Sequence, residues 1–124
     1  MDERTYVIPD MVFVARERQN IIGSANIEAA PDLVCEIVSP SSLRSDLLTK
    51  RSLYAQIGVR EYWIVDPEVQ TVAVLKLESA SFVEITPGEP GEISSRVLPN
   101  LRLSLAEVFE DVNFPPDNLS LIHI

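Results

Sequence analysis

Two carboxylates in this chain lie within or beside apolar, strand-like sequence. Glu36 interrupts the run LVCEIV (33–38), and Asp10 follows Pro9 in YVIPDMVFVA (6–15). A buried carboxylate is costly unless it is paired with a positive charge or binds a cation. If the two strands pair, these side chains converge at one end of a sheet. Mg²⁺ is usually held by one or two carboxylates and several waters, so we predict a Mg²⁺ site formed by Asp10 and Glu36.

A lysine follows on the helix that is predicted directly after the Glu36 segment. The Lys50 ammonium would stabilise the negative charge that builds on a phosphate during attack, or would help to deprotonate the attacking water. Asp10, Glu36 and Lys50 together therefore indicate metal-dependent hydrolysis of a phosphoester.

Each of these residues also has a purely structural interpretation. Asp10 could be a turn residue whose side chain satisfies backbone amides. Glu36 could form a buried ion pair with Lys50 or with an arginine. Asp46 and Lys50, four residues apart, could be an exposed helix pair worth about a few tenths of a kcal/mol.

Other reactive side chains are assigned structural roles. Asp32 repeats the Pro-Asp dipeptide and is expected to form a strand-entry turn, or to contact the metal-binding residues without binding the metal itself. Cys35 is expected in the core, because its only potential base, His123, lies in the terminal tail. The remaining assignments are Ser39 and Ser41 as helix caps, and Tyr54, Tyr62 and Trp63 as core residues.

The apolar pattern predicts the elements that position these groups. We expect strands over 6–15, 31–38, 61–65, 72–77 and 82–85, a loop over 16–30 and a final extended stretch over 93–105. A helix is expected from Leu43 or Ser45 to Ile57, ended by Gly58, and a short helix over 105–109. The residues expected on the apolar face of the long helix are Leu47, Leu48, Tyr54 and Ala55. This order predicts an α/β or α+β fold around a mixed sheet.

Composition limits the class of protein. The chain has 124 residues, of which 46% are hydrophobic and 6% aromatic, as expected for one soluble domain. No apolar run is long enough to cross a membrane, and a single cysteine makes a reducing cytoplasm the default location. The net charge of −9 argues against a broad basic surface for nucleic acid, but it leaves room for a local basic groove.

Several motifs together carry a family resemblance. They are PD at 9–10, PDLVCEIVSPSS at 31–42, Asp46, Lys50 and Tyr54 on the helix, GV at 58–59, EYWIVDP at 61–67 and LPNLRLSLAEVF at 98–109. The pattern resembles a large bacterial family of putative restriction endonucleases in the PD-(D/E)xK nuclease superfamily. The resemblance covers roughly residues 6–109.

The resemblance implies a restriction-endonuclease-like mixed sheet flanked by helices, and hydrolysis of DNA phosphodiesters with Mg²⁺ or Mn²⁺. Asp10 matches the Asp of the PD motif, and Glu36 matches the acid of (D/E)xK. The superfamily's lysine would stand at Val38, which faces the same side as Glu36 on an extended strand. In this family the lysine is thought to have moved to the following helix, which selects Lys50.

Both ends of the chain bear on this prediction. Family members carry an upstream helix and strand, so an N-terminally truncated domain over 1–118 is expected. Residues 119–124, LSLIHI, resemble a translated sequencing adapter and are expected to be a non-native tail.

DNA is the expected partner, and a homodimer is a further possibility. The alternatives are a catalytically inactive interaction module on the same fold, and a hydrolase acting on another phosphoester.

Overall fold

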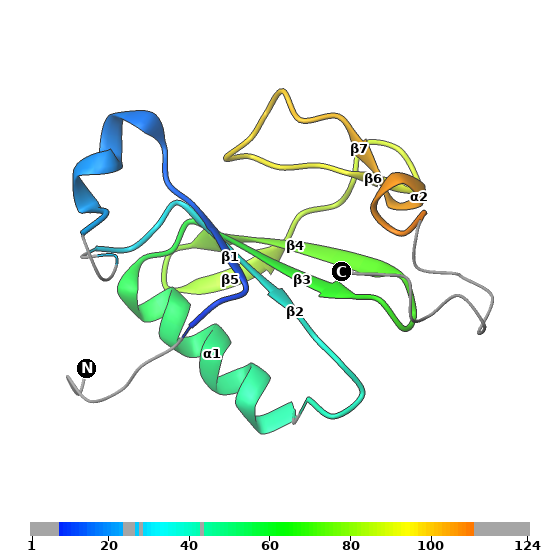
Figure 1. The fold of residues 1–124 in the computed structure, drawn as a ribbon, viewed down its shortest axis with the longest axis horizontal. Coiled ribbons are helices and arrows are strands. Elements are labelled where there is room, and N and C mark those ends of the chain that lie inside the picture. Colours follow the sequence, from blue (N-terminus) through cyan, green and yellow to red (C-terminus); the bar gives the residue numbers. More distant parts are fainter. Residues whose placement is uncertain (1–7, 24–26, 28, 43, 111–124) are drawn as a thin grey trace.

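The computed structural model describes residues 8–23, 27, 29–42 and 44–110. Its elements, shown in Figure 1, are β1 (Met11–Phe13), the 3-10 helix η1 (Arg16–Ile21), β2 (Leu33–Ile37), α1 (Arg44–Ile57), β3 (Glu61–Asp66), β4 (Thr71–Glu78), β5 (Ser81–Glu84), β6 (Glu92–Ile93), β7 (Leu103–Ser104) and α2 (Leu105–Val108). The tail at 119–124, with His123, lies outside the described residues, as does Leu43 at the helix start.

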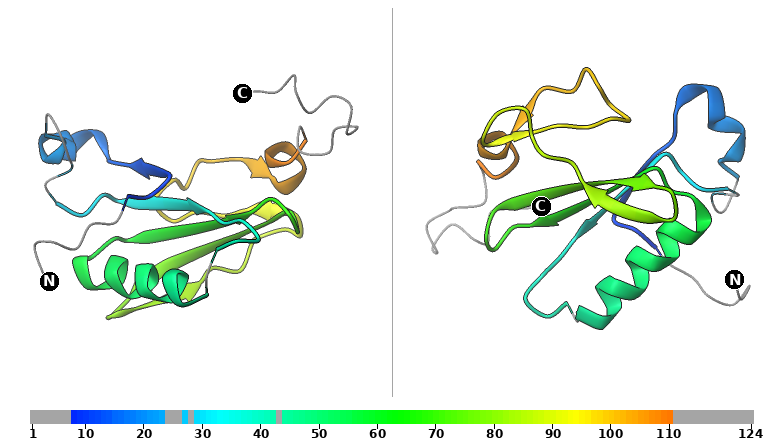
Figure 2. Two further views of the ribbon diagram at one scale, coloured as in Figure 1. Left: turned by 60° about the horizontal axis from the view of Figure 1, so that its bottom comes forward. Right: turned by 180° about the vertical axis from the view of Figure 1, so that it is seen from behind.

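Five strands form one mixed sheet in the spatial order β1-β2-β3-β4-β5. The pair β2 and β3 is parallel, whereas the other neighbours are antiparallel. A parallel pair needs a crossover connection, and α1 provides it. Figure 2 shows α1 on one side of the sheet and the β6–β7 hairpin with α2 on the other. The predicted α+β architecture around a mixed sheet is therefore confirmed.

The helix α1 ends where its sequence predicts. Gly58 has a φ of 93°, a left-handed conformation that favours glycine. The N–H groups of Gly58 and Val59 both donate to the carbonyl of Tyr54, at 3.2 and 3.0 Å. The predicted apolar face is wrong at Leu48, which is 52% exposed. Leu48 lies on an open groove between α1 and the β4–β5 turn, with Arg51 and Phe82 among its lining residues.

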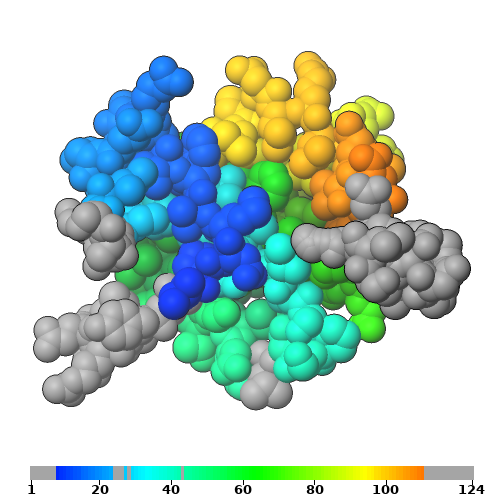
Figure 3. All heavy atoms as spheres, viewed as in Figure 1, coloured from blue at the N-terminus to red at the C-terminus, as the bar shows by residue number. Residues whose placement is uncertain are grey.

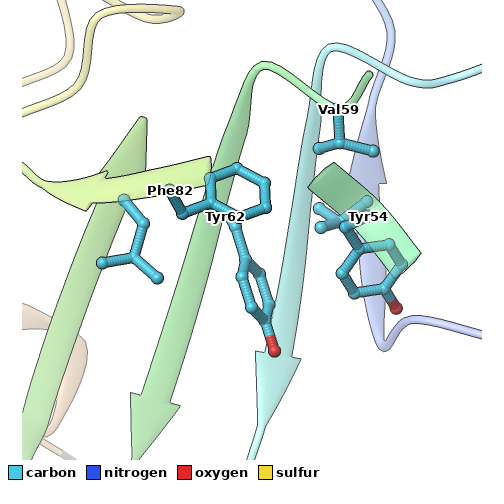
Figure 4. Close-up of a cluster of buried hydrophobic side chains, with 6 residues drawn as sticks. Tyr54, Val59, Tyr62 and Phe82 are labelled. Atoms are coloured by element: carbon cyan, nitrogen blue, oxygen red, sulfur yellow. The ribbon is translucent and has the colours of Figure 1, made fainter. Parts of the chain in front are cut away.

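Each face of the sheet has its own core. The core under α1 consists of Val34, Tyr54, Val59, Tyr62, Leu75 and Phe82, and Figure 4 shows most of these side chains packed together. On the opposite face, Val74, Ile85 and Ile93 pack with Trp63 and with apolar residues of β7 and α2. The core assignments of Cys35, Tyr54 and Tyr62 are confirmed by burial, and Trp63 packs against the second core while remaining partly exposed.

Two predicted irregular regions contain more structure than expected. The segment predicted as a loop over 16–30 includes η1, and the predicted extended stretch over 93–105 is instead two short strands paired as a hairpin. The polar sequence of η1 gives no apolar periodicity. This helix is stabilised by contacts with residues outside it, because the Arg18 guanidinium donates to the carbonyl of Ala30 and pairs with Asp32 at 3.0 Å.

The buried carboxylate of Asp32 anchors the start of β2. It accepts a hydrogen bond from the Ala15 N–H at 2.7 Å and pairs with Arg18 and Arg60. Asp32 therefore does more than the expected strand-entry role, because it joins the segment after β1, the helix η1 and the segment before β3. No helix among residues 8–23 and 44–110 is long and apolar enough to span a membrane.

Asp32 should make the fold sensitive to acid. Burial alone would raise the pKa of Asp32, but the Ala15 amide and the two arginines outweigh it and hold this pKa below its ordinary value of 3.8. A lowered pKa in the folded state contributes stability above the unfolded pKa, and this contribution is lost as pH falls through the folded pKa. We expect urea unfolding between pH 6 and pH 3 to show a smaller loss of stability in Asp32→Asn than in the unsubstituted chain. Parallel pH dependence of the two proteins would contradict this role.

Candidate functional site

Glu36 is the buried acid of the site. It lies on β2 two residues after Val34, so both side chains face α1. Its exposed fraction is only 4%. Its Oε2 accepts a hydrogen bond from the Tyr54 hydroxyl, and its Oε1 lies 3.5 Å from the Lys50 Nζ. The prediction that an acid within this apolar strand must have partners is therefore confirmed.

Both partners of Glu36 come from one face of α1. Lys50 and Tyr54 are four residues apart, which places them on neighbouring turns of the same helix face. The Lys50 side chain is 35% exposed, so its ammonium lies at the edge of the core. Within the described part of the chain, the ion pair of Lys50 is with Glu36 and not with Asp46, so the proposed Asp46–Lys50 pair is wrong.

Asp10 lies at the entry to β1, next to the Glu36 segment. Met11 pairs with Cys35 in the antiparallel β1–β2 ladder, and continuing this register by one residue sets Asp10 opposite Glu36. The Oδ2 of Asp10 accepts a hydrogen bond from the Ile37 N–H at 2.7 Å. Figure 3 shows the segment that starts β1, in dark blue, at the surface beside α1. Asp10 is therefore an exposed carboxylate close to the buried one.

The negative charges of Asp10 and Glu36 contribute to raised pKa values of two neighbouring groups, Cys35 and Tyr54. Burial, followed by the charges of Asp10 and Glu36, raises the pKa of the Cys35 thiol to about 11. Burial, the hydrogen bond to Glu36 and the charge of Asp10 raise the pKa of Tyr54 above its usual range. A raised pKa favours the protonated thiol of Cys35, in keeping with its place in the core, and Tyr54 acts as a hydrogen-bond donor to Glu36.

The donor set is small but suits a hard cation. Among the described residues, no three acidic, histidine or cysteine side chains gather into a metal-binding group. Mg²⁺ is commonly bound through one or two carboxylates and keeps several waters, so two acids satisfy its usual requirement. The structure brings the Lys50 ammonium within 3.5 Å of Glu36 and places Asp10 opposite Glu36 in the β1–β2 register. Val38 lies just beyond β2, bonded through its N–H to the Val65 carbonyl, and supplies no ammonium.

A third buried carboxylate, Glu61, was not predicted from the sequence as a functional residue. It opens β3 on the face opposite Tyr62 and accepts hydrogen bonds from the Trp63 indole, the Ser95 hydroxyl and the N–H groups of Arg96 and Val97. Glu61 directly precedes the apolar run YWIV. The criterion applied to Glu36, an acid within or beside an apolar strand-like segment, therefore also identifies Glu61. With these partners Glu61 fixes the loop that follows β6.

Comparison with known proteins agrees with this fold. Residues 1–106 match the family Uma2, described as putative restriction endonuclease. The match spans most of the chain, which therefore belongs to this family, and the resemblance drawn from its motifs is confirmed. A comparison with curated proteins gave no match.

A solved structure shares the architecture. It is a crystal structure of a putative nuclease belonging to DUF820 from Anabaena variabilis, with a TM-score of 0.64 and 21% sequence identity. The similarity covers 86% of this chain and 62% of that chain, so this chain spans less than two thirds of its relative. At this low identity, the structural similarity establishes the common fold alone.

Proposed function

We propose that this chain is the nuclease domain of a DNA endonuclease that uses Mg²⁺ or Mn²⁺. Asp10 and Glu36 are the metal ligands, and Lys50 is the catalytic ammonium. The observation that carries the proposal is the contact between the buried Glu36 carboxylate and the partly exposed Lys50, with Asp10 at the adjoining strand entry. Membership of the Uma2 family supports phosphodiester hydrolysis as the reaction.

The chain's own residues have separate tasks in this mechanism. Asp10 and Glu36 hold the divalent cation, which when bound would act as a Lewis acid on the scissile phosphate and lower the pKa of a bound water. The Lys50 Nζ, at the solvent edge of the pair, stabilises the negative charge that develops on the phosphate oxygens. Burial of Glu36 under α1 keeps its carboxylate in one place during this process.

A non-catalytic interaction module is the second candidate, and one observation favours it. Both oxygens of Glu36 already have partners within the chain, since Tyr54 donates to one and Lys50 lies near the other. This arrangement is also that of a structural ion pair. The net charge of −9 further weakens binding to a polyanion.

Thermal unfolding with divalent cations distinguishes the two candidates. A ligand that binds only the folded state stabilises it by about 2.7 kcal/mol at 100 times its Kd. We expect Mg²⁺ or Mn²⁺ to raise the Tm by several degrees relative to EDTA, with the same increase in the control Glu84→Gln, which removes an exposed acid on β5. An unchanged Tm at millimolar cation would contradict the nuclease proposal and favour the module.

A further inference from the structure

The carboxylate of Glu36 is held by two different donors on its two oxygens. The Tyr54 hydroxyl donates to Oε2, whereas the Lys50 ammonium lies 3.5 Å from Oε1. A separation of 3.5 Å is long for a charge-assisted hydrogen bond, which is normally about 2.7–2.9 Å. Oε2 is therefore the more firmly held oxygen, and Oε1 makes the looser of the two contacts.

The tyrosine that holds Oε2 has little freedom to move. Tyr54 is 3% exposed, and its ring meets that of Tyr62 edge-on with centroids 5.2 Å apart. Tyr62 packs in turn against Phe82. Figure 4 shows the labelled rings of Tyr54, Tyr62 and Phe82 in this cluster. The backbone of Tyr54 is fixed as well, because its carbonyl accepts the hydrogen bonds that end α1.

We propose that Tyr54 is a positioning residue of the metal site, which fixes the plane of the Glu36 carboxylate so that Oε1 is directed toward the cation. This inference rests on the proposed function and deepens it. Groups that orient metal ligands by hydrogen bonding typically change metal affinity or activity by about 10–100-fold when they are removed. Tyr54 acts through Glu36 and does not itself touch the reacting atoms.

The neighbouring tyrosine provides a matched control. The Tyr62 hydroxyl is buried and, among the described residues, has no hydrogen-bond partner. Tyr62→Phe removes the same atom from the adjacent ring and leaves Glu36 with both of its donors. A buried hydroxyl without a partner is destabilising, so this variant should fold with equal or greater stability.

The test is a Mn²⁺ titration of the metal-depleted 124-residue chain, followed by electron paramagnetic resonance. We expect Tyr54→Phe to weaken Mn²⁺ binding about 10–100-fold, while Tyr62→Phe binds as the unsubstituted chain does. Equal binding by Tyr54→Phe and the unsubstituted chain would overturn the positioning role alone. Equal weakening in both variants would also overturn it, because the effect would then reflect general packing. Absence of Mn²⁺ binding by the unsubstituted chain would overturn the proposed function together with this role.

A second measurement needs no metal. The proton NMR spectrum of the metal-free chain should contain a slowly exchanging tyrosine hydroxyl resonance that is lost in Tyr54→Phe and shifted in Glu36→Gln. This resonance should persist unshifted in Tyr62→Phe. If no such resonance depends on Glu36, the hydrogen bond that carries the inference is refuted, whatever the metal titration gives.

Discussion

Glu36→Ala is expected to abolish Mg²⁺-dependent cleavage of DNA by this chain and by longer members of its family. The substitution removes the only buried acid of the site and leaves Asp10 as a single exposed ligand. Metal catalysis stabilises the transition state by several kcal/mol, and each 1.36 kcal/mol is tenfold in rate, so a loss of about 10³-fold or more is expected. Cleavage of plasmid DNA, compared in Mg²⁺ and in EDTA, measures it.

The fold should survive this change. The partly exposed Lys50 can be hydrated when its partner is lost, whereas the buried Tyr54 hydroxyl loses its acceptor at a cost of about 1–3 kcal/mol. Glu36→Gln restores an acceptor for Tyr54 and still removes the negative charge, so it should be nearly as inactive and more stable. Glu84→Gln is the matched control for charge. If Glu36→Gln, folded by circular dichroism, cleaved DNA at the normal rate, the assignment of Glu36 would be wrong.

Glu61→Ala is expected to cause the largest loss of stability. It would leave four donors without their acceptor, namely the Trp63 indole, the Ser95 hydroxyl and two backbone amides of the loop after β6. Unsatisfied buried donors cost about 1–3 kcal/mol each before the loop relaxes into water. A decrease of about 3–5 kcal/mol in the free energy of unfolding is therefore expected, measured by urea denaturation.

The single tryptophan reports on this change directly. Trp63 donates to Glu61 and packs in the second core, so its fluorescence should shift to longer wavelength in Glu61→Ala before global unfolding. Mn²⁺ binding by the folded fraction should persist, because Glu61 and Glu36 lie on opposite faces of the sheet. Glu68→Ala, in an exposed turn, is the control. A loss below about 1 kcal/mol in Glu61→Ala would refute its role in fixing the loop.

Local patterns predicted the parts of the fold that depend on neighbours in sequence. The bounds of α1 follow from its composition and from Gly58, and the acid within LVCEIV was recognisable because the surrounding residues are apolar. Family motifs then selected Lys50 on the helix. The structure places Lys50 next to Glu36, whereas the residues alone, without the family motifs, favoured an exposed pair with Asp46.

What the sequence did not predict depends on distant partners. The Glu61 carboxylate receives its amide donors from residues 35 and 36 positions later, and no periodicity encodes such a contact. Tyr54 was assigned to the core on the strength of its ring, which is correct, but its hydroxyl partner lies 18 residues earlier on another element. The 3-10 helix η1 likewise depends on Asp32, which lies beyond the helix itself.

The spacing of Lys50 and Tyr54 on α1 limits which changes in chain length this fold can accept. An α-helix turns by about 100° per residue, so one residue inserted between these two positions would carry one donor away from the Glu36 carboxylate. An insertion within Ser39–Ser42, before the helix, could instead bulge outward without rotating either side chain. Between Glu36 and Tyr54, length variation among natural homologues should therefore fall in that loop, while the interval from 50 to 54 stays constant.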